Sequence, residues 1–427
     1  MLWDVFCRVI DNFGDIGVCW RLSADLAARG QQVRLWVDDA SALGWMAPEV
    51  SWSGDAAGML VGAGHPGITV RCWADAEQAE AETVPEPGDV VIEAFGCDPP
   101  EAFLRRMNRP TPPAWVNLEY LSAEDYVERS HGLLSPVFSG PAAGLRKHFF
   151  YPGFTPRTGG LLREPDLARR QAAFTEDARL GWLRRLGVPA TADCRLVSVF
   201  CYATAPLGEW LDALADEAVQ LAIAKQGQHE STTRILLTPG HATQLAQAWL
   251  ASASSERRQA LACHELPALS QPEFDHLLWA CHLNIVRGED SAVRALWAGR
   301  PHVWHIYPQD DGAHAAKLDA FLDRWLMGAP ASLSSDVRAA WHHFNRLPGP
   351  VSGASCVTSG SKSLDTVCEP SPDSAGHRPP APPLPDWRDP DGEWARFSRA
   401  ARQRMAAQAD LGTQLLAFVT PIVTSSG

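Results

Sequence analysis

Two aspartates, Asp11 and Asp15, stand four residues apart on a turn near the start of the chain. The turn contains glycine, follows an apolar run typical of a buried strand, and precedes a helix expected to begin at about Ile16. Such a unit exposes polar groups at the carboxyl edge of a parallel sheet. Two carboxylates there are suited to act as a general base and its helper. The spacing also fits a helix for which Asp15 is only the N-cap, and both interpretations stay open.

A second unit of this kind occupies the stretch Leu283–Trp297. An apolar strand ends at Arg287, and Gly288 permits a sharp turn. A helix is expected to begin at Asp290 or Ser291. The first amides of a helix have no internal partners and favour an anion, so a diphosphate fits this position, with Arg287 adding a charge-assisted contact. The alternative is that Asp290 or Ser291 is an ordinary N-cap, and acidic residues there oppose an anion.

Aromatic residues flank this second unit. Phe200 and Tyr202 end an expected strand, and Phe274 lies three residues after Gln271. Beside a phosphate site such rings can stack on a nucleotide base or pack on its sugar. From the sequence alone, simple packing in the core is the better explanation for each single ring.

The composition limits the classes of partner. At 427 residues the chain is long enough for two or three domains, and its formal net charge of −13 argues against a general nucleic-acid or anionic-membrane binder. No apolar run approaches the roughly 20 residues that span a bilayer, and the acidic Asp4 within the first apolar run is unlike a signal peptide. The ten cysteines lack CxxC pairs, which predicts reduced thiols, a cytoplasmic protein and no metal site.

Strand-like and helix-like segments alternate in two successive halves, residues 1–180 and 181–344. Strands are expected at Val33–Val37, Ile68–Cys72, Asp89–Ala94, Ala114–Leu118, Leu196–Tyr202, Arg234–Thr238, Leu283–Val286 and His302–Ile306. Alternation of this kind predicts an α/β protein with two Rossmann-like domains that face a central cleft.

The rest of the chain divides into two further segments. Residues 345–386 are rich in Pro, Ser and Gly and poor in large apolar residues, which predicts a flexible insertion. Residues 387–427 return to helical periodicity. Leu411, Leu415 and Phe418 form a face that we expect to pack back on the N-terminal domain.

With both units considered, the chain resembles the EarP family, the bacterial protein-arginine rhamnosyltransferases that modify translation elongation factor P. The resemblance spans most of residues 1–345 and resumes in the C-terminal helices. It is carried by Asp11–Gly17, Arg287–Ser291, Phe200 with Tyr202, Gln271 with Phe274, and Trp304–Gln309. The insertion at residues 345–386 departs from the family pattern and leaves the path of the chain back to the N-terminal domain open.

The resemblance implies a GT-B glycosyltransferase that inverts configuration, uses dTDP-β-L-rhamnose as donor, and needs no metal or other cofactor. Its acceptor would be one arginine of elongation factor P, which rhamnosylation activates to relieve ribosome stalling at polyproline. The N-terminal domain would receive this protein and the C-terminal domain the nucleotide sugar. By motif position, the catalytic carboxylates would be Asp11, Asp15 and Glu289. The donor-binding residues would be Phe200, Tyr202, Gln271, Phe274, Arg287, Asp290 and Ser291.

Within this scheme we assign Asp15 as the general base, with Asp11 positioning the guanidinium or the neighbouring loop and Glu289 reaching the guanidinium from the opposite domain. Two rival functions remain. One is a GT-B enzyme that uses another nucleotide sugar and a small-molecule or lipid acceptor. The other is a protein that binds elongation factor P without catalysis.

Overall fold

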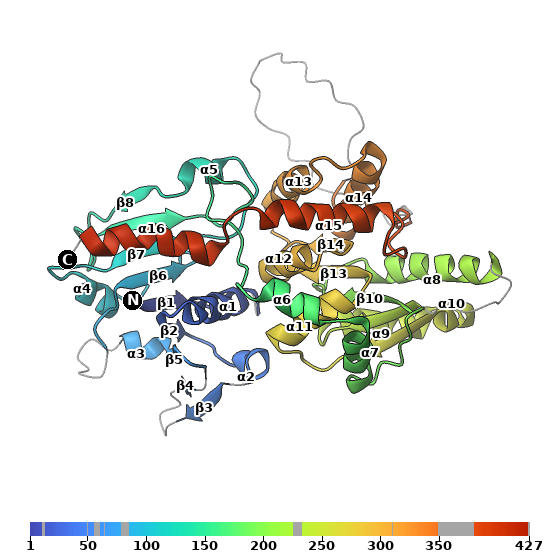
Figure 1. Ribbon diagram of the computed structural model, residues 1–427, viewed down its shortest axis with the longest axis horizontal. Helices are drawn as coiled ribbons and strands as arrows, with labels where there is room; N and C mark the ends of the chain where they lie inside the picture. The colour runs from blue at the N-terminus through green and yellow to red at the C-terminus, as the bar shows by residue number, and fades with distance from the viewer. Residues whose placement is uncertain are drawn as a thin grey trace, which may run out of the picture.

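The computed structural model describes residues 1–10, 13–48, 50–54, 60–63, 65–77, 85–224, 233–309, 311–348 and 380–425. Two β-sheets lie side by side, each with its own helices, and α-helices at the C-terminus run across both (Figure 1). Asp11 lies outside the described residues, as do residues 349–379 of the expected insertion.

The first sheet has nine strands in the order β3-β4-β5-β2-β1-β6-β7-β9-β8. Its strands are β1 (Leu2–Cys7), β2 (Gln32–Val37), β3 (Ser51–Gly54), β4 (Leu60–Ala63), β5 (Ile68–Cys72), β6 (Val90–Ala94), β7 (Ala114–Leu118), β8 (Leu134–Pro136) and β9 (Arg146–Phe150). The run from β5 to β9 is parallel and follows the Rossmann order, while β3, β4 and β8 join antiparallel at the edges.

The second sheet has five parallel strands in the order β12-β11-β10-β13-β14. Its strands are β10 (Arg195–Val199), β11 (Thr233–Leu237), β12 (Leu261–Glu265), β13 (Leu283–Arg287) and β14 (His302–His305). In both sheets the strand order reverses beside the first strand, between β1 and β6 and between β10 and β13. Open α/β sheets bind their ligands at such points, beyond the carboxyl ends of the strands.

The central strands are buried on both faces because helices cover both faces. The helices of the first half are α1 (Gly14–Ala28), α2 (Leu43–Met46), α3 (Trp73–Glu77), α4 (Glu101–Met107) and α5 (Tyr126–Ser130). Those that follow are α6 (Leu167–Ala173), α7 (Glu176–Arg185), α8 (Leu207–Ala224), α9 (His241–Ser252), α10 (Ser255–Ala260), α11 (Gln271–Ala280), α12 (Gly288–Ala298), α13 (Ala313–Trp325), α14 (Ala331–Phe344), α15 (Glu393–Ala406) and α16 (Leu411–Ser425).

Asp4 is the one charged residue of β1, and both oxygens of its carboxylate accept hydrogen bonds. Its carboxylate accepts two hydrogen bonds from Arg34 of β2, both at 2.6 Å, and others from Trp36 and from the Gly88 amide, both at 2.7 Å. A buried carboxylate is tolerated when its oxygens are paired in this way.

The two C-terminal helices, α15 and α16, pack on different domains. Leu411, Leu415 and Val419 of α16 are buried in the core of the first domain, which confirms the expected return of the chain. Helix α15 instead places Trp394 and Ala401 in the core of the second domain, so the expectation that all the C-terminal helices pack on the N-terminal domain was wrong for α15. A path across both domains lets one segment contribute to two cores (Figure 1).

The α/β fold with two Rossmann-like domains is confirmed. Two strands, Ile68–Cys72 and Ala114–Leu118, have the expected bounds. The strand expected to reach Tyr202 ends at Val199, so its aromatic residues lie in the loop beyond the sheet. The short strands β3, β4, β8, β9 and β12 were not expected, and the domain boundaries at residues 180 and 344 stay predictions. None of the helices in the described ranges has the length and apolarity to cross a bilayer.

Candidate functional site

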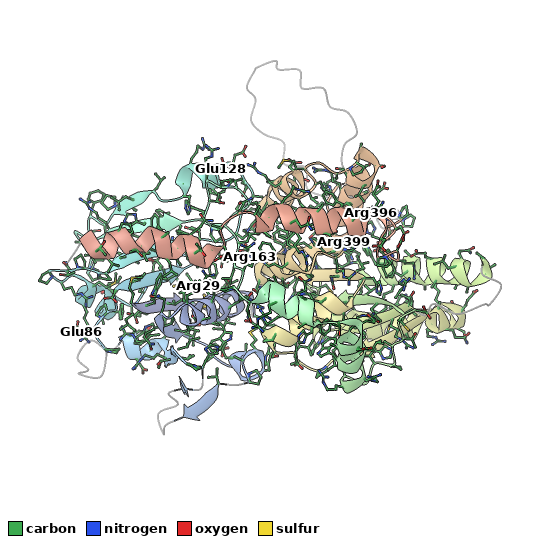
Figure 2. The ribbon with its side chains drawn as sticks, in the orientation of Figure 1. Arg29, Glu86, Glu128, Arg163, Arg396 and Arg399 are labelled. Atoms are coloured by element: carbon green, nitrogen blue, oxygen red, sulfur yellow. The ribbon has the colours of Figure 1, made fainter. Side chains whose placement is uncertain are left out.

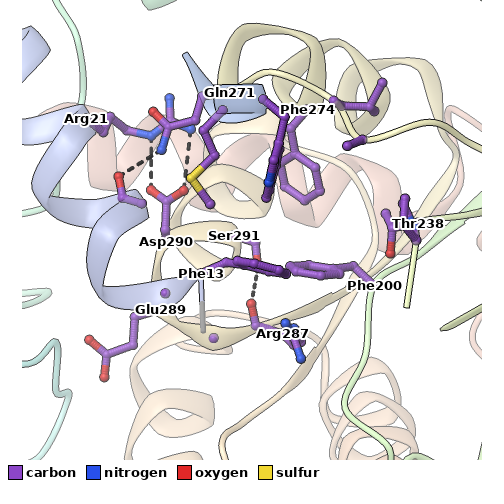
Figure 3. A pocket seen from close by; sticks show the side chains of 18 of the residues that line it. Phe13, Arg21, Phe200, Thr238, Gln271, Phe274, Arg287, Glu289, Asp290 and Ser291 are labelled. Carbon is purple, nitrogen blue, oxygen red and sulfur yellow. Dashed lines mark hydrogen bonds and ion pairs between the residues drawn. The ribbon is translucent and has the colours of Figure 1, made fainter. Parts of the chain in front are cut away.

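A cavity of about 200 Å³ lies between the two domains, where α1 meets the amino ends of α11 and α12. All the residues predicted to bind the donor line it: Phe200, Tyr202, Gln271, Phe274, Arg287, Asp290 and Ser291. Phe13 and Gly17 of the first domain also line it, and Figure 3 shows Phe13 beside Phe200 and Ser291. We call this the donor pocket. The structure therefore brings this whole set into one place.

Arg287 ends β13 and lies among aromatic rings. Its guanidinium carbon is 4.5 Å from the ring centre of Phe200 and 4.6 Å from that of Tyr202, contacts that hold a planar cation (Figure 3). No carboxylate within the described ranges forms an ion pair with it. Gly288 turns the chain into α12 with φ at +66°, a conformation that glycine adopts without strain. Arg287 thus presents an unneutralised cation at the start of a helix.

Helix α12 begins earlier than expected, and this decides the roles of two residues. Its N-cap is Arg287, so neither Asp290 nor Ser291 is the cap and both capping alternatives were wrong. The Ser291 hydroxyl donates to the carbonyl of Arg287. Asp290 pairs with Arg21 of α1 at 3.0 Å. Because Arg21 neutralises Asp290, the electrostatic objection to an anion at this helix start is much reduced.

Gln271 joins the two domains while lining the pocket. It opens α11, whose N-cap Ser270 accepts a hydrogen bond from the Glu273 amide. Its side-chain amide donates to the Gly17 carbonyl of α1 at 2.8 Å. Gln271 therefore holds α1 against the second domain beside the pocket that it lines.

The aromatic residues divide between cavity and core. Phe200 and Phe274 are half-buried, with ring centres 5.8 Å apart and ring planes at 70°, and both face the cavity (Figure 3). Tyr202 is buried and packs edge-on against His305. Burial and the charge of Arg287 lower the pKa of His305 to about 3, so its neutral ring accepts a hydrogen bond from the Tyr202 amide. Tyr202 is therefore partly a core residue, whereas Phe200 and Phe274 present ring faces on which a ligand can stack.

Asp15 lies in the first turn of α1, one residue past the helix start, and Phe13 is at the N-cap. The expected start at Ile16 was two residues late, and Asp15 is not at the capping position. One carboxylate oxygen accepts from the Ile10 amide at 2.9 Å, and the other from the Tyr120 hydroxyl at 3.3 Å. These donors fix the orientation of a carboxylate that is buried beside a second cavity.

This second cavity, the acceptor pocket, has a volume of about 210 Å³ and is lined by Asp15 and Glu289, one from each domain. Glu289 accepts a hydrogen bond from the Leu121 amide at 2.7 Å and pairs with Lys317 at 2.6 Å. Glu289 also lines the donor pocket, so the two pockets adjoin. Two carboxylates from opposite domains thus flank the junction of the pockets.

Three residues of the acceptor pocket were not predicted from the sequence: Phe95, Tyr120 and Lys317. Phe95 and Tyr120 follow β6 and β7 and stack with ring centres 4.3 Å apart and planes at 12°. The Lys317 ammonium lies 5.8 Å from the Tyr120 ring centre. An aromatic residue just beyond an expected strand was the available signal for Phe95 and Tyr120, since it falls at the ligand-binding edge of the sheet. Lys317 gave none.

A buried network of charges joins the domains behind the donor pocket. Its cations are Arg21, Arg170 and Arg294, and its anions are Glu164, Asp275 and Asp290. Arg294 donates to both oxygens of Asp275 at 2.7 and 2.6 Å. Arg294 and Arg21 donate to Glu164 at 2.7 and 2.9 Å. Paired ions of this kind fix the relative position of the domains, since each charge depends on partners from other elements.

Glu164 should make stability dependent on pH. Burial disfavours its charged form, but Arg294 and Arg21 outweigh burial and hold the pKa of its carboxyl well below the ordinary 4.5. A carboxyl whose pKa is depressed by folding stabilises the protein above its unfolded-state pKa, and this contribution is lost as pH falls. We expect Glu164→Gln to lower the free energy of unfolding by about 3–5 kcal/mol at neutral pH and to flatten its decline as pH falls below about 4.5. Urea unfolding at several pH values would measure both, and an unchanged pH slope would contradict this account.

No group of three or more His, Cys, Asp or Glu side chains in the described part of the chain is arranged to hold a metal ion. His302 and His305 are both buried in β14, where burial lowers the pKa of His302 to about 4.

Comparison with known proteins agrees with this architecture. The family model of the elongation factor P rhamnosyltransferase EarP matches residues 3–420. A protein-arginine rhamnosyltransferase of Pseudomonas putida is 45% identical over 347 residues, which cover 80% of this chain and 86% of that protein. The corresponding protein of Pseudomonas aeruginosa is 42% identical over 348 residues, again 80% of this chain and 86% of that protein.

A solved structure from a study of EarP-mediated arginine glycosylation of translation elongation factor EF-P superposes with a TM-score of 0.53 at 27% identity, covering 98% of both chains. The two Rossmann-like domains facing each other are the GT-B arrangement that the resemblance implied. From the family match and these relatives, the chain belongs to the EarP family of protein-arginine rhamnosyltransferases and is a glycosyltransferase.

Proposed function

We propose that this enzyme transfers L-rhamnose from dTDP-β-L-rhamnose to a guanidinium nitrogen of one arginine of elongation factor P, with inversion at the sugar carbon. The observation that carries the proposal is the junction of the two pockets at Glu289. On one side lies an unneutralised arginine at a helix start, and on the other a buried aspartate from the facing domain. A sugar held at the junction would have a leaving diphosphate on one side and a nucleophile on the other.

The donor pocket suits a nucleoside diphosphate. Arg287 and the first amides of α12 would bind the diphosphate and stabilise the negative charge that develops as it leaves. Phe200 and Phe274 would pack on the thymine ring or the deoxyribose. Asp290 contributes by accepting from Arg21, which keeps its own charge away from the diphosphate.

The acceptor pocket suits a guanidinium. Arginine is a poor nucleophile because its lone pairs are delocalised and its pKa lies above about 12. Asp15 would accept the proton as the nitrogen bonds to the anomeric carbon and the bond from that carbon to the diphosphate oxygen breaks. Direct displacement converts the β-linked donor into an α-linked product. Glu289 would bind the guanidinium fork from the second domain, and the role of Asp11 as a positioning residue stays a prediction.

Intact-protein mass spectrometry tests the reaction. The purified protein is incubated with dTDP-β-L-rhamnose and elongation factor P, with a second sample in which UDP-glucose replaces the donor. We expect one deoxyhexose on elongation factor P in the first sample alone, located on arginine by fragmentation. Addition from UDP-glucose instead would favour the rival GT-B enzyme. Complex formation without any mass change from either donor would favour a non-catalytic binding protein.

We expect the reaction not to depend on a divalent metal, because Arg287 and the amides of α12 are placed to neutralise the leaving diphosphate. The initial rate in excess EDTA should stay within about twofold of the rate without chelator, and added Mg²⁺ should not raise it. A loss of activity in EDTA that Mg²⁺ restores would overturn this mechanism.

A translation factor as acceptor places the reaction in the cytoplasm, where rhamnosylation would activate the factor for relief of stalling at polyproline. The described cysteines agree with a reducing compartment, because all eight are free thiols and Cys7, Cys19 and Cys201 are among those buried in the core.

A further inference from the structure

A third cavity, of about 700 Å³, lies at the carboxyl end of α12, the end away from the donor pocket. Elements from distant parts of the chain enclose it: α6, α7, the end of α12, the segment before α15, and α15 itself. Since α12 has 11 residues, the two ends of this helix are about 16 Å apart. The cavity is therefore separate from the proposed site of transfer.

Arginine dominates the charge of this cavity. Its lining contains Arg163, Arg179, Arg300, Arg399 and Arg402, but only two carboxylates, Glu176 and Asp391. Figure 2 labels two of these arginines, Arg163 near the end of α15 and Arg399 along it. Such an excess of cations is unexpected in a chain with a formal net charge of −13. We call this the arginine cavity.

The two carboxylates do not neutralise the cluster. Glu176 pairs with Arg179 at 2.7 Å, and Asp391 with Arg399 at 3.2 Å. The Nη2 atom of Arg179 is nevertheless buried without a hydrogen-bond acceptor in the described part of the chain, and its side chain is only 8% exposed. A buried guanidinium nitrogen without an acceptor is costly, and it leaves part of the positive charge of Arg179 uncompensated beside this cavity.

Arg300 is the least satisfied member. Within the residues that the structure describes, its half-buried side chain makes no hydrogen bond and no ion pair. Burial lowers the pKa of Arg300, and the charges of Arg179, Arg399 and Arg402 lower it further. Arg300 is thus surrounded by other positive charges, and a bound anion would stabilise this arrangement.

Three of these arginines also donate to backbone carbonyls: Arg163 to Ala406, Arg179 to Ala280 and Arg399 to Pro390. A further structural role for the cluster would be to neutralise the last carbonyls of α12. The structure gives that task to another side chain, because Gln171 donates to the Ala298 carbonyl at 3.1 Å. Arg402 in turn donates to Gln171 at 2.6 Å. It lies across Gly299, where an added Cβ would be 3.1 Å from its Cδ atom, so the helix end is shaped to admit Arg402.

We propose that the arginine cavity binds a small phosphorylated anion that carries a diphosphate or two nearby phosphates. Five arginines line one cavity, and a guanidinium can bind phosphate oxygens two at a time. The volume is in the range of pockets that hold metabolite-sized ligands. The proposal does not depend on the identity of the sugar donor or of the acceptor.

Inorganic pyrophosphate is the probe, measured by isothermal titration calorimetry in an Arg287→Met background so that the donor pocket does not bind it. We expect saturable binding, and a melting temperature that rises by a few degrees with pyrophosphate but not with sodium chloride of equal ionic strength. Absence of binding, or an equal effect of the chloride control, would overturn the proposal.

Arg300→Met, added to that background, is the decisive variant. We expect it to weaken pyrophosphate binding at least tenfold while leaving the melting temperature without anion unchanged or higher, because it removes a cation that its neighbours repel. A residue that only supports the fold would lower that temperature. The matched control is Arg404→Met, an exposed arginine of α15 outside the cavity lining, which should bind as its parent does. Undiminished binding by Arg300→Met, or by Arg300→Gln if the first variant does not fold, would refute the proposed site.

Discussion

Asp15→Asn is expected to reduce the rate of rhamnosyl transfer by about 10²- to 10⁴-fold at saturating donor and acceptor, the contribution usual for a general base. The substitution keeps the size of the side chain and an oxygen that can accept from the Ile10 amide, so α1 should begin as before. Donor affinity should change little, because Asp15 lines the acceptor pocket and not the donor pocket. Single-turnover rates by intact mass, with donor binding measured by calorimetry, separate the two quantities.

Tyr120→Phe is the matched control for this prediction. It removes the hydroxyl that donates to Asp15 at 3.3 Å but keeps the ring that stacks on Phe95, so the carboxylate remains able to accept a proton. We expect a loss of less than about tenfold. If Asp15→Asn and Glu289→Gln both retained turnover, neither carboxylate could be the base and the catalytic assignment would fail.

Arg287→Met is expected to lower kcat/KM for the donor by about 10²- to 10³-fold, the usual cost of removing one preorganised group that stabilises developing charge. Arg287 has no carboxylate partner within the described residues, so its removal deprives no buried carboxylate of an ion pair. The start of α12 should persist, because the Ser291 hydroxyl bonds to the backbone carbonyl of residue 287 and not to its side chain. Initial rates at limiting donor measure the effect.

Arg287→Lys serves as the charge-conserving control. Lysine supplies a cation but lacks the planar fork that lies 4.5 Å from Phe200 and 4.6 Å from Tyr202. We therefore expect Arg287→Lys to recover only part of the lost rate. Full activity in Arg287→Met would show that the diphosphate is bound elsewhere, and full activity in Arg287→Lys would show that charge alone suffices.

Much of the architecture followed from local patterns. Continuous apolar runs such as Ala114–Leu118 marked strands buried on both faces, and glycine marked the sharp turn at Gly288. Parallel strands end at a common edge, so residues that follow them gather there, and this placed the predicted donor set in one pocket. The expected start was two residues late for α1 and two or three residues late for α12, because the observed N-caps, Phe13 and Arg287, are not typical capping residues.

The partners of the charged groups were decided only by the tertiary structure. Arg21 and Asp290 are 269 residues apart, and the sequence offered no period that relates them. The Glu289 contacts to Leu121 and Lys317 likewise join α12 to the loop after β7 and to α13. Thus the sequence determined the strands, the turns and the chemistry available at each edge, because these depend on neighbouring residues. Three other features depend on how the two domains and α15 pack together. These are the ion pair of Asp290, the placement of Asp15 opposite Glu289, and the enclosure of the arginine cavity.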